Sequence, residues 1–479
     1  MKALTVPRIV CSVLTLGILN TSFGQEQNQL KEPPTINYAV DRGTLDYSYL
    51  SEESTAQEYK EVFAQNLKYI PMGRNKDFYF TVGGQYRPRY EITVNEDWTE
   101  KDLYYYSQRL FLSSNFHWGK YVRTHVELHN ALTTNNEAIL LEDDDLFIYQ
   151  GYAEFTLPLQ NSKLLVSVGR RLLDYGAERL ISRRAGPNVR RSFDVVKTDY
   201  VFGKNKIEAF YGFEVASELG SFDNDFTLFE AENENDNLGI IGVYATLDSD
   251  KILGSGQFYY IRYHNRQAAF SDVTGEETRH TVGIRRYGKI GKKGSFNTEL
   301  IYQFGEIGDS DISAFNIEVD YGYFLSEGGL RPKIGLKYDF SSGDRDPGDG
   351  KINTYQPLFV NPAIYSLASI NTPVNLNGIH PSLLLTFNSK FSVFMDYSAY
   401  FRASKNDGYY TPPRFQTRPA SLGSSRFLGH AVGMKVNYYV SRNIYFWWRT
   451  GYFIAGDFIK ESGPSNNIFY TGPNIEFNF

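Results

Sequence analysis

The stretch FYFTVGGQYRPRYEITV, at residues 78–94, alternates between two kinds of side chain with a period of two residues. One face carries mostly aromatic and aliphatic groups, whereas the other carries Arg87, Arg89 and Glu91. Successive side chains of a β-strand point to opposite faces, so this pattern predicts a strand that separates an apolar from a polar environment. The stretch is also longer than the roughly 9–11 residues that a strand needs to cross a membrane.

The same alternation recurs along the chain. In residues 121–132, apolar side chains alternate with Arg123, His125 and Glu127. By this criterion we predict about 18 strands, which suits a large membrane barrel. They lie near residues 77–94, 103–116, 120–132, 146–157, 163–173, 193–202, 206–216, 237–248, 254–264, 279–289, 294–305, 311–325, 329–340, 380–389, 391–402, 426–440, 443–455 and 466–479.

Short and long connections alternate between these strands. Short turns such as 203–205 are followed by much longer loops such as 174–192 and 341–379. An outer-membrane barrel has an even number of strands, short periplasmic turns and long extracellular loops, whereas a soluble sandwich has no reason to show this alternation. The predicted fold class is therefore all-β, a transmembrane antiparallel β-barrel with both termini in the periplasm. The final alternating stretch ends on Phe479, as is common for barrels of the outer membrane.

The N-terminal region predicts export from the cytoplasm. Residues 1–24 combine a basic start, an apolar stretch and a small-residue cleavage site, which together indicate a signal peptide. Cys11, the only cysteine, is removed with it, so we expect no disulfide and no thiolate ligand in the mature protein. Residues 25–76 are polar and predict a mostly irregular periplasmic extension, with a plug in the lumen as the alternative. The outer-membrane barrel is expected at 77–479.

Charge and motifs argue against several functions. The net charge of −6 becomes −8 when Lys2 and Arg8 are removed with the signal peptide, which argues against a nucleic-acid partner. The sequence has no nucleophile elbow, zinc-protease motif or phosphate-binding glycine loop, so we predict neither an enzyme nor a cofactor. His125 and His129 resemble a metal pair, but four residues along one strand separate them by roughly 13 Å. A place in the lumen wall is the favoured interpretation.

Acidic residues form three further groups. Asp344, Asp346 and Asp349 lie among glycines and resemble a calcium-binding loop, although their spacing is not that of an EF-hand. A solvated turn is the favoured alternative for them. The acidic runs 142–145 and 223–236 are expected to be exposed loops.

The densest positive charge lies in residues 170–191, where seven arginines are opposed only by Asp174 and Glu178, a local charge of +5. Guanidinium groups keep their charge and bind carboxylates in bidentate fashion, so such a cluster over or inside a pore predicts anion selectivity. An outer loop that binds lipopolysaccharide phosphate is the alternative. The seven arginines are Arg170, Arg171, Arg179, Arg183, Arg184, Arg190 and Arg191.

The predicted strand register adds charges of both signs to the lumen wall. Twelve basic side chains are expected to point inward against ten acidic ones, so selectivity should come mainly from the arginine segment. The basic set is Arg87, Arg89, Arg109, Arg123, Arg262, Arg285, Arg331, Lys333, Lys337, Arg402, Lys435 and Arg449, and the acidic set is Glu91, Glu127, Glu154, Glu208, Glu214, Glu299, Glu318, Asp320, Asp339 and Asp396. From the wall, the candidate substrate-binding residues are Arg87, Arg89, Arg109, Arg123, Arg402 and Arg449.

Several short motifs, taken in order, resemble those of the alginate-export family of porins. The resemblance implies an 18-stranded barrel with an electropositive lumen, and the founding members of that family export alginate, a polyuronate with one carboxylate per sugar. Arg171 and Ala177 stand where the family usually has Gln and Asp, so the solute of this chain can differ. The motifs are KYIPM at 68–72, GGQYRPRYE at 83–91, GRR at 169–171, YGAERL at 175–180, SGD at 342–344, YQPLF at 355–359 and YFIAGDF at 452–458.

These observations together predict a passive outer-membrane channel that passes an anionic polysaccharide or sugar acid through an arginine-lined lumen. The alternatives are an outer-membrane hydrolase, which needs a Ser, His and acid set in three dimensions, and a structural or adhesin barrel with a blocked lumen. The expected partners are outer-membrane lipid and lipopolysaccharide, the anionic solute, and a periplasmic secretion or uptake protein.

Overall fold

The structure is a computed structural model that describes residues 67–134, 139–228, 238–249, 254–326, 328, 330–367, 369–412, 414–441 and 443–479. The predicted signal peptide and the part of the predicted extension before residue 67 lie outside these residues.

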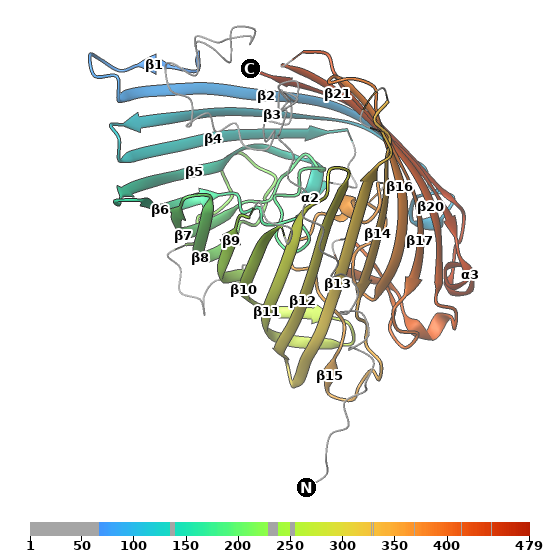
Figure 1. Ribbon diagram of the computed structural model, residues 1–479. Helices are drawn as coiled ribbons and strands as arrows, with labels where there is room; N and C mark the ends of the chain where they lie inside the picture. Colours follow the sequence, from blue (N-terminus) through green and yellow to red (C-terminus); the bar gives the residue numbers. More distant parts are fainter. Residues whose placement is uncertain are drawn as a thin grey trace, which may run out of the picture. The chain divides into compact units, whose positions relative to one another are not determined.

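Within the described residues, eighteen antiparallel strands form a closed β-barrel (Figure 1). Each wall strand pairs with the next along the chain, and the last pairs with the first. The strands are β2 (Phe78–Val94), β3 (Leu103–Trp118), β4 (Val122–Thr133), β5 (Asp144–Pro158), β6 (Ser162–Arg171), β7 (Phe193–Phe202), β8 (Asn205–Glu214), β9 (Gly239–Leu247), β10 (Ser255–Phe270), β11 (Val273–Ile290), β12 (Gly294–Ile307), β13 (Ser310–Phe324), β14 (Lys333–Ser341), β16 (Leu376–Thr386), β17 (Phe391–Arg402), β20 (Phe427–Tyr439), β21 (Ile444–Ala455) and β22 (Ile468–Asn478).

The barrel closes where β22 meets β2. The Gly84 N–H donates to the Phe479 carbonyl at 2.9 Å, and the Phe479 N–H donates back at 3.0 Å. Nearer its start, β2 pairs with the short strand β1 (Ile70–Pro71), and the buried Lys68 donates its ammonium group to the Val82 carbonyl at 3.1 Å. Residues 67–71, expected to be irregular, are therefore attached to the wall by strand pairing.

The two faces of the wall differ as the alternation predicts. On β3, Leu110 and Leu112 are exposed, whereas Ser107, Arg109 and Ser113 are buried. The polar face is the inner one, because its side chains contact loops inside the barrel. The apolar face is the outer one, which meets lipid in a membrane barrel.

All eighteen predicted strands are present, but some of their ends differ. β10 and β11 run on to a two-residue turn at 271–272, although the sequence predicted a gap from 265 to 278 between them. Polar side chains interrupt the apolar alternation there, so periodicity could not show these strand extensions. Arg262 was predicted to point inward, which is wrong: Ile261 and Tyr263 are fully buried on the inner face, so Arg262 lies on the outer one.

The remaining elements are short. Among the described residues, no helix is long and apolar enough to cross a membrane. The short elements are η2 (Glu96–Trp98), α2 (Ile139–Glu142), β15 (Lys351–Ile352), η3 (Pro362–Ile364), β18 (Tyr409–Thr411), β19 (Phe415–Arg418), η4 (Ala420–Leu422) and α3 (Asp457–Ser462).

Candidate functional site

Two long loops, both predicted to be extracellular, fold back into the barrel. Loop A comprises residues 172–192, between β6 and β7, and loop B comprises residues 342–375, between β14 and β16. Ile181 of loop A forms a parallel bridge with Phe359 of loop B, and both side chains are buried. The Ser182 N–H also donates to the Phe359 carbonyl at 2.9 Å. The loops thus form one unit, which contacts the inner face of the wall.

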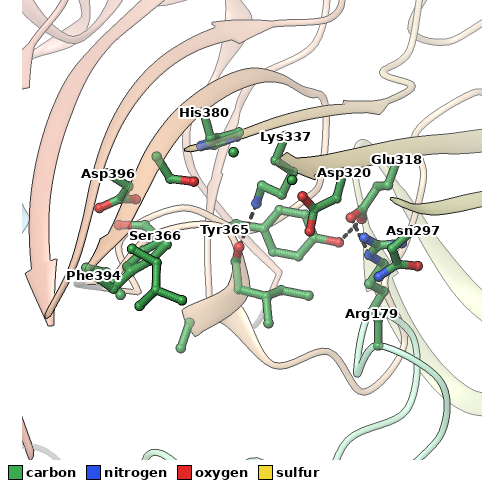
Figure 2. Close-up of a pocket in the computed structure, with 18 of the residues that line it drawn as sticks. Arg179, Asn297, Glu318, Asp320, Lys337, Tyr365, Ser366, His380, Phe394 and Asp396 are labelled. Carbon is green, nitrogen blue, oxygen red and sulfur yellow. Dashed lines mark hydrogen bonds and ion pairs between the residues drawn. The ribbon is translucent and has the colours of Figure 1, made fainter. Parts of the chain in front are cut away.

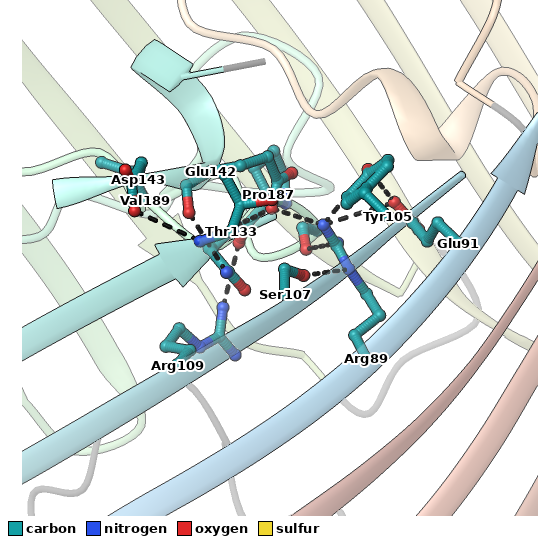
Figure 3. Close-up of polar contacts among 12 residues, drawn as sticks. Arg89, Glu91, Tyr105, Ser107, Arg109, Thr133, Glu142, Asp143, Pro187 and Val189 are labelled. Carbon is teal, nitrogen blue, oxygen red and sulfur yellow. Dashed lines mark hydrogen bonds and ion pairs between the residues drawn. The ribbon is translucent and has the colours of Figure 1, made fainter. Parts of the chain in front are cut away.

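Two wall arginines hold the far end of loop A. Arg87 on β2 lies directly opposite Arg109 on β3 in the strand register. Both donate to the Pro187 carbonyl, Arg87 at 3.2 Å and Arg109 at 3.1 Å, and both also reach the Ala185 carbonyl. Arg109 and Pro187 are labelled in Figure 3. Arg87 further donates to the Asn188 side chain at 2.9 Å. The terminal nitrogens of Arg87 thus donate to neutral oxygen atoms of loop A, whereas those of Arg109 donate to loop A and to the side-chain oxygen of Gln85 at 3.0 Å.

Arg89 links loop A to a third segment. It donates to the Gly186 carbonyl at 2.8 Å and forms a 2.5 Å ion pair with Glu142 of α2 (Figure 3). Glu142 and Asp144 are buried, so the prediction of an exposed loop at 142–145 is wrong for these two residues. The second acidic run lies partly outside the described residues, which exclude 229–237.

Arg179 ties loop A to the opposite part of the wall. Its guanidinium group is 3.1 Å from a carboxylate oxygen of Glu299 on β12. It also pairs with Glu318 on β13 (Figure 2). Tyr365 of loop B donates its hydroxyl group to the same Glu318. Burial opposes the charge of Arg179, but the two carboxylates outweigh it and raise its pKa. One cluster therefore fixes both loops to the wall.

Most of the predicted arginines are neutralised by carboxylates in this way. Like Arg89 and Arg179, six more form ion pairs within the described residues. These pairs are Arg123 with Glu154 at 3.1 Å, Arg170 with Asp194 at 2.8 Å, Arg171 with Glu154 at 3.8 Å, Arg183 with Asp174 at 3.5 Å, Arg191 with Glu214 at 2.5 Å, and Arg449 with Glu91 at 3.7 Å.

In four of the predicted arginines, no ion pair with a carboxylate offsets the positive charge within the described residues. Across the part of the chain that the structure describes, no carboxylate forms an ion pair with Arg87, Arg109, Arg184 or Arg402. Arg184 donates to the Val189 carbonyl at 3.2 Å; burial, and next the charge of Arg191, lower its pKa to about 10, so it remains protonated at neutral pH.

The positive surplus is concentrated beside β2 and β3. Arg190 packs against the ring of Phe111 at 4.7 Å, and Arg109 packs against the same ring at 5.0 Å. Burial lowers the pKa of Arg190. The arginine segment therefore lies inside the barrel, buried against its wall, and not in an outer loop facing lipopolysaccharide as the alternative prediction had it.

A cavity of about 410 Å³ lies between the loops and the wall on the other side (Figure 2). Its lining carries charges of both signs, along with hydroxyl, amide and imidazole groups. Lys337, for example, donates to the Ile364 carbonyl of loop B at 2.6 Å. Such a lining can hydrogen-bond a polar, hydroxyl-rich solute. The charged lining residues are Arg179, Lys333, Lys337, Glu318, Asp320 and Asp396.

One Ser, His and Asp set bears on the hydrolase alternative. His380 Nδ1 is 2.7 Å from Ser398 Oγ, and His380 Nε2 is 2.8 Å from a carboxylate oxygen of Asp339. His380 is a site residue that was not predicted from the sequence, although it and Ser382 lie two residues apart, and so on one face, in the predicted strand. Ser398 is 1% exposed, and its strand pairs with both neighbouring strands. A hydrolase needs an accessible nucleophile and hydrogen-bond donors aimed at an oxyanion. Because Ser398 is buried, we interpret these three residues as part of the structure of the wall.

The metal candidates do not form a site. Asp344 accepts from the Asp346 N–H at 3.3 Å, whereas Asp349 accepts from the Lys351 N–H at 2.8 Å. No group of three or more His, Cys, Asp or Glu side chains within the described ranges is placed to hold a metal ion. Burial raises the pKa of Asp344 to about 6.

The histidine pair on β4 belongs to the wall, as predicted. His125 Nδ1 is 2.9 Å from the Asn115 side-chain oxygen, and His129 packs against the ring of Phe111 with centroids 4.3 Å apart. Both histidines are buried.

A closed barrel with an apolar outer face, a polar inner face and loops folded into the lumen defines a porin, an outer-membrane channel for solutes. The sequence matches the model of the alginate export family over residues 78–472, and the chain belongs to this family. A search of curated proteins finds no match.

Several solved porin structures from Pseudomonas aeruginosa are similar to the chain. OpdO has a TM-score of 0.56 at 11% identity, over 84% of this chain and 97% of its own. OccK2 (OpdF), crystallised in complex with glucuronate, has a TM-score of 0.53 at 9% identity, over 84% and 98%. OpdK, crystallised with vanillate, has a TM-score of 0.52 at 11% identity, over 83% and 98%. These similarities confirm the fold, and the family membership with this barrel fold supports an integral outer-membrane location.

Proposed function

We propose that the channel passes anionic sugar acids or polyuronate chains, with Arg87 and Arg109 at the center of its selectivity. The observation that carries this proposal is that both charges lie on the inner face without a carboxylate in an ion pair within the described residues, while terminal nitrogens of both donate to loop A carbonyl groups. A charge held in this way acts on a passing ion without being cancelled locally.

The size of the effect follows from Coulomb's law. In water, one unit charge about 7 Å from a passing monovalent ion contributes roughly 0.6 kcal/mol, attractive for an anion and repulsive for a cation. Two such arginines therefore favour an anion over a cation by about 2 kcal/mol, a preference of tens-fold before salt screening reduces it. The paired arginines contribute much less, because their carboxylates cancel the field within a few ångströms.

The kind of solute is inferred from two further observations. The chain belongs to the alginate export family, and the similar porin OccK2 was crystallised with glucuronate. Both names point to carboxylate-bearing sugars. The cavity beside loop B supplies the mixed hydrogen-bonding groups that a hydroxyl-rich sugar needs as it moves through the lumen.

The test is the reversal potential of the purified channel in a planar bilayer with a KCl gradient. We expect anion selectivity in the wild type and a clear shift toward cations in the double variant Arg87→Gln/Arg109→Gln. A matched control is Lys289→Gln/Lys292→Gln, which removes two exposed charges at the end of the barrel that carries the short turns. Glucuronate and alginate oligomers should reduce the wild-type KCl current more than the neutral sugar glucose does.

The outcomes separate the alternatives. A cation-selective or non-selective wild type would end the proposal of an anion pathway, while the assignment as a channel would stand. Absence of any conductance by correctly folded protein would favour the structural or adhesin barrel.

A further inference from the structure

A second concave site lies on the barrel, separate from the lumen. It has a volume of about 450 Å³, and three cationic side chains line it: Arg345 of loop B, and Lys405 and Arg426 from the ends of the segment between β17 and β20. All three are exposed. None of the described residues that line this hollow is acidic. The site is therefore accessible and carries positive charge.

The hollow borders the outer, lipid-facing side of the wall. Phe340, which forms part of its lining, follows the exposed Leu336 and Tyr338 on the same face of β14. In the register, Phe340 lies opposite Asn377 of β16, which in turn lies opposite Phe401 of β17. These side chains form a row on the outer face.

Further aromatic rings extend this row on both sides. The Phe315 ring stacks on Phe340 with centroids 5.4 Å apart, and the Phe427 ring contacts Phe401 at 5.3 Å. The row lies where β14 and β17 end and β20 begins, and these ends lead into the long loops. The long loops are extracellular, so the row lies at the level of the outer leaflet and the cations lie just above it.

Nearby carboxylates lie outside the lining of the hollow and offset its three charges only in part. Asp344 and Asp407 are buried within the loops, where Asp407 accepts from the Asp344 N–H at 2.9 Å and from Tyr410 at 2.8 Å. Asp346 is exposed beside Arg345 and offsets part of its charge.

A second exposed carboxylate is positioned by the backbone. Glu461 accepts from the N–H groups of Ser424 and Ser425, next to Arg426. Arg426 itself is oriented by donation from one Nη atom to the Ala403 carbonyl at 2.6 Å. Three cations thus converge on the hollow, with the exposed carboxylates outside its lining.

We propose that this hollow binds the phosphate groups of lipid A, the lipid anchor of lipopolysaccharide, in the outer leaflet. Arg345, Lys405 and Arg426 contact the phosphates, and the acyl chains lie against the aromatic row below. Lipid A fits because it joins phosphorylated sugars directly to acyl chains, and the site places cations directly beside an apolar, lipid-facing surface. Guanidinium and ammonium groups are the usual protein partners of phosphate.

The experiment measures lipid binding to the full-length mature protein in detergent by native mass spectrometry. Wild type is compared with Arg345→Gln/Lys405→Gln/Arg426→Gln, and with Lys120→Gln/Lys289→Gln/Lys292→Gln as a control at the short-turn end. The probes are diphosphoryl lipid A, dephosphorylated lipid A, and inorganic phosphate as a competitor. Heat-modifiable mobility and single-channel conductance verify that each variant is folded.

We expect the first triple variant to lose about a hundredfold of its affinity for diphosphoryl lipid A, because it removes three basic residues beside an anionic lipid group. The control variant should bind like wild type, and dephosphorylated lipid A should bind weakly to all three proteins. Equal binding of lipid A by wild type and the first triple variant would overturn the proposal. Equal binding of both lipids by wild type would overturn it too. Displacement of lipid A by millimolar inorganic phosphate would instead indicate a site for a soluble phosphate, against the proposal.

If the triple variant does not fold, the single variants Arg345→Gln and Lys405→Gln, both on exposed loops, replace it with the same criteria.

Discussion

Replacement of Arg179 with methionine tests whether loop A closes the lumen. Arg179 is buried, and its side chain lies between the carboxylates of Glu299 and Glu318. Methionine keeps the apolar length of the side chain but leaves two buried carboxylates without their cation. Removing one partner from a buried ion pair costs about 3–5 kcal/mol. Because each 1.36 kcal/mol is a factor of ten, the attached state of loop A should lose about two to four orders of magnitude in stability relative to a released state.

The expected readout is electrical. Single-channel conductance in concentrated KCl should rise in Arg179→Met, since the released loop no longer fills that part of the lumen. The reversal potential in a KCl gradient should move toward cations, because Glu299 and Glu318 then face the pathway with their charges unpaired.

The control is the triple variant Arg179→Met/Glu299→Gln/Glu318→Gln. Replacing every member of a buried ionic group with neutral residues of similar size is often close to neutral for stability, so its conductance should return toward the wild-type value. Wild-type conductance and selectivity in Arg179→Met would refute the reasoning. Equal conductance in the single and the triple variant would show that lost packing, and not the unpaired charge, releases the loop.

Two further predictions concern loop B and the wall. Since the pKa of Asp344 is about 6 when the loop is packed, its carboxyl group keeps a proton that the unpacked loop releases. Protection of residues 342–354 from hydrogen exchange, corrected for the intrinsic rate, should therefore fall as the pH rises from about 4 to 6 in wild type. It should fall less in Asp344→Asn, where only the raised pKa of the neighbouring Asp407 remains. For the wall, Ser398→Ala should hydrolyse a soluble p-nitrophenyl ester at the same background rate as wild type, because Ser398 is buried and both ring nitrogens of His380 are engaged. A higher rate in wild type that the substitution abolishes would instead identify a hydrolase.

The barrel could be predicted from sequence because the membrane constrains the wall at every second residue. On β3, Leu110 and Leu112 must face lipid, while Phe111 between them and Arg109 before them face inward. The requirement for alternating side chains weakens where a strand extends beyond the part of the outer face that contacts lipid. The end of β10 and the start of β11 carry polar residues on both faces, so the hairpin around 271–272 appeared in the sequence as a loop.

The inward position of the wall arginines followed from the same rule, but their partners did not. Arg179 and Glu299 are separated by 120 residues, and Arg191 reaches the Phe359 carbonyl across 168 residues. The sequences of loops A and B have no periodicity that would indicate whether the loops fold into the lumen or away from it. The arginines and their partners meet only because the barrel closes around the two loops. For His380 a signal was present, since it and Ser382 alternate with Leu383 within a predicted strand.

The structure also changes where the selectivity of the channel should originate. The surplus of +5 in residues 170–191 suggested a strong local field, but burying a guanidinium group is costly unless its donors are satisfied. Carboxylates pair with most of these arginines and offset their charge, whereas loop A carbonyls accept from Arg87 and Arg109 and leave their charge in place. The same carbonyls position loop A in the lumen. In the proposed function, selectivity and constriction depend on one set of contacts, and a variant that releases loop A at Pro187 should change both together.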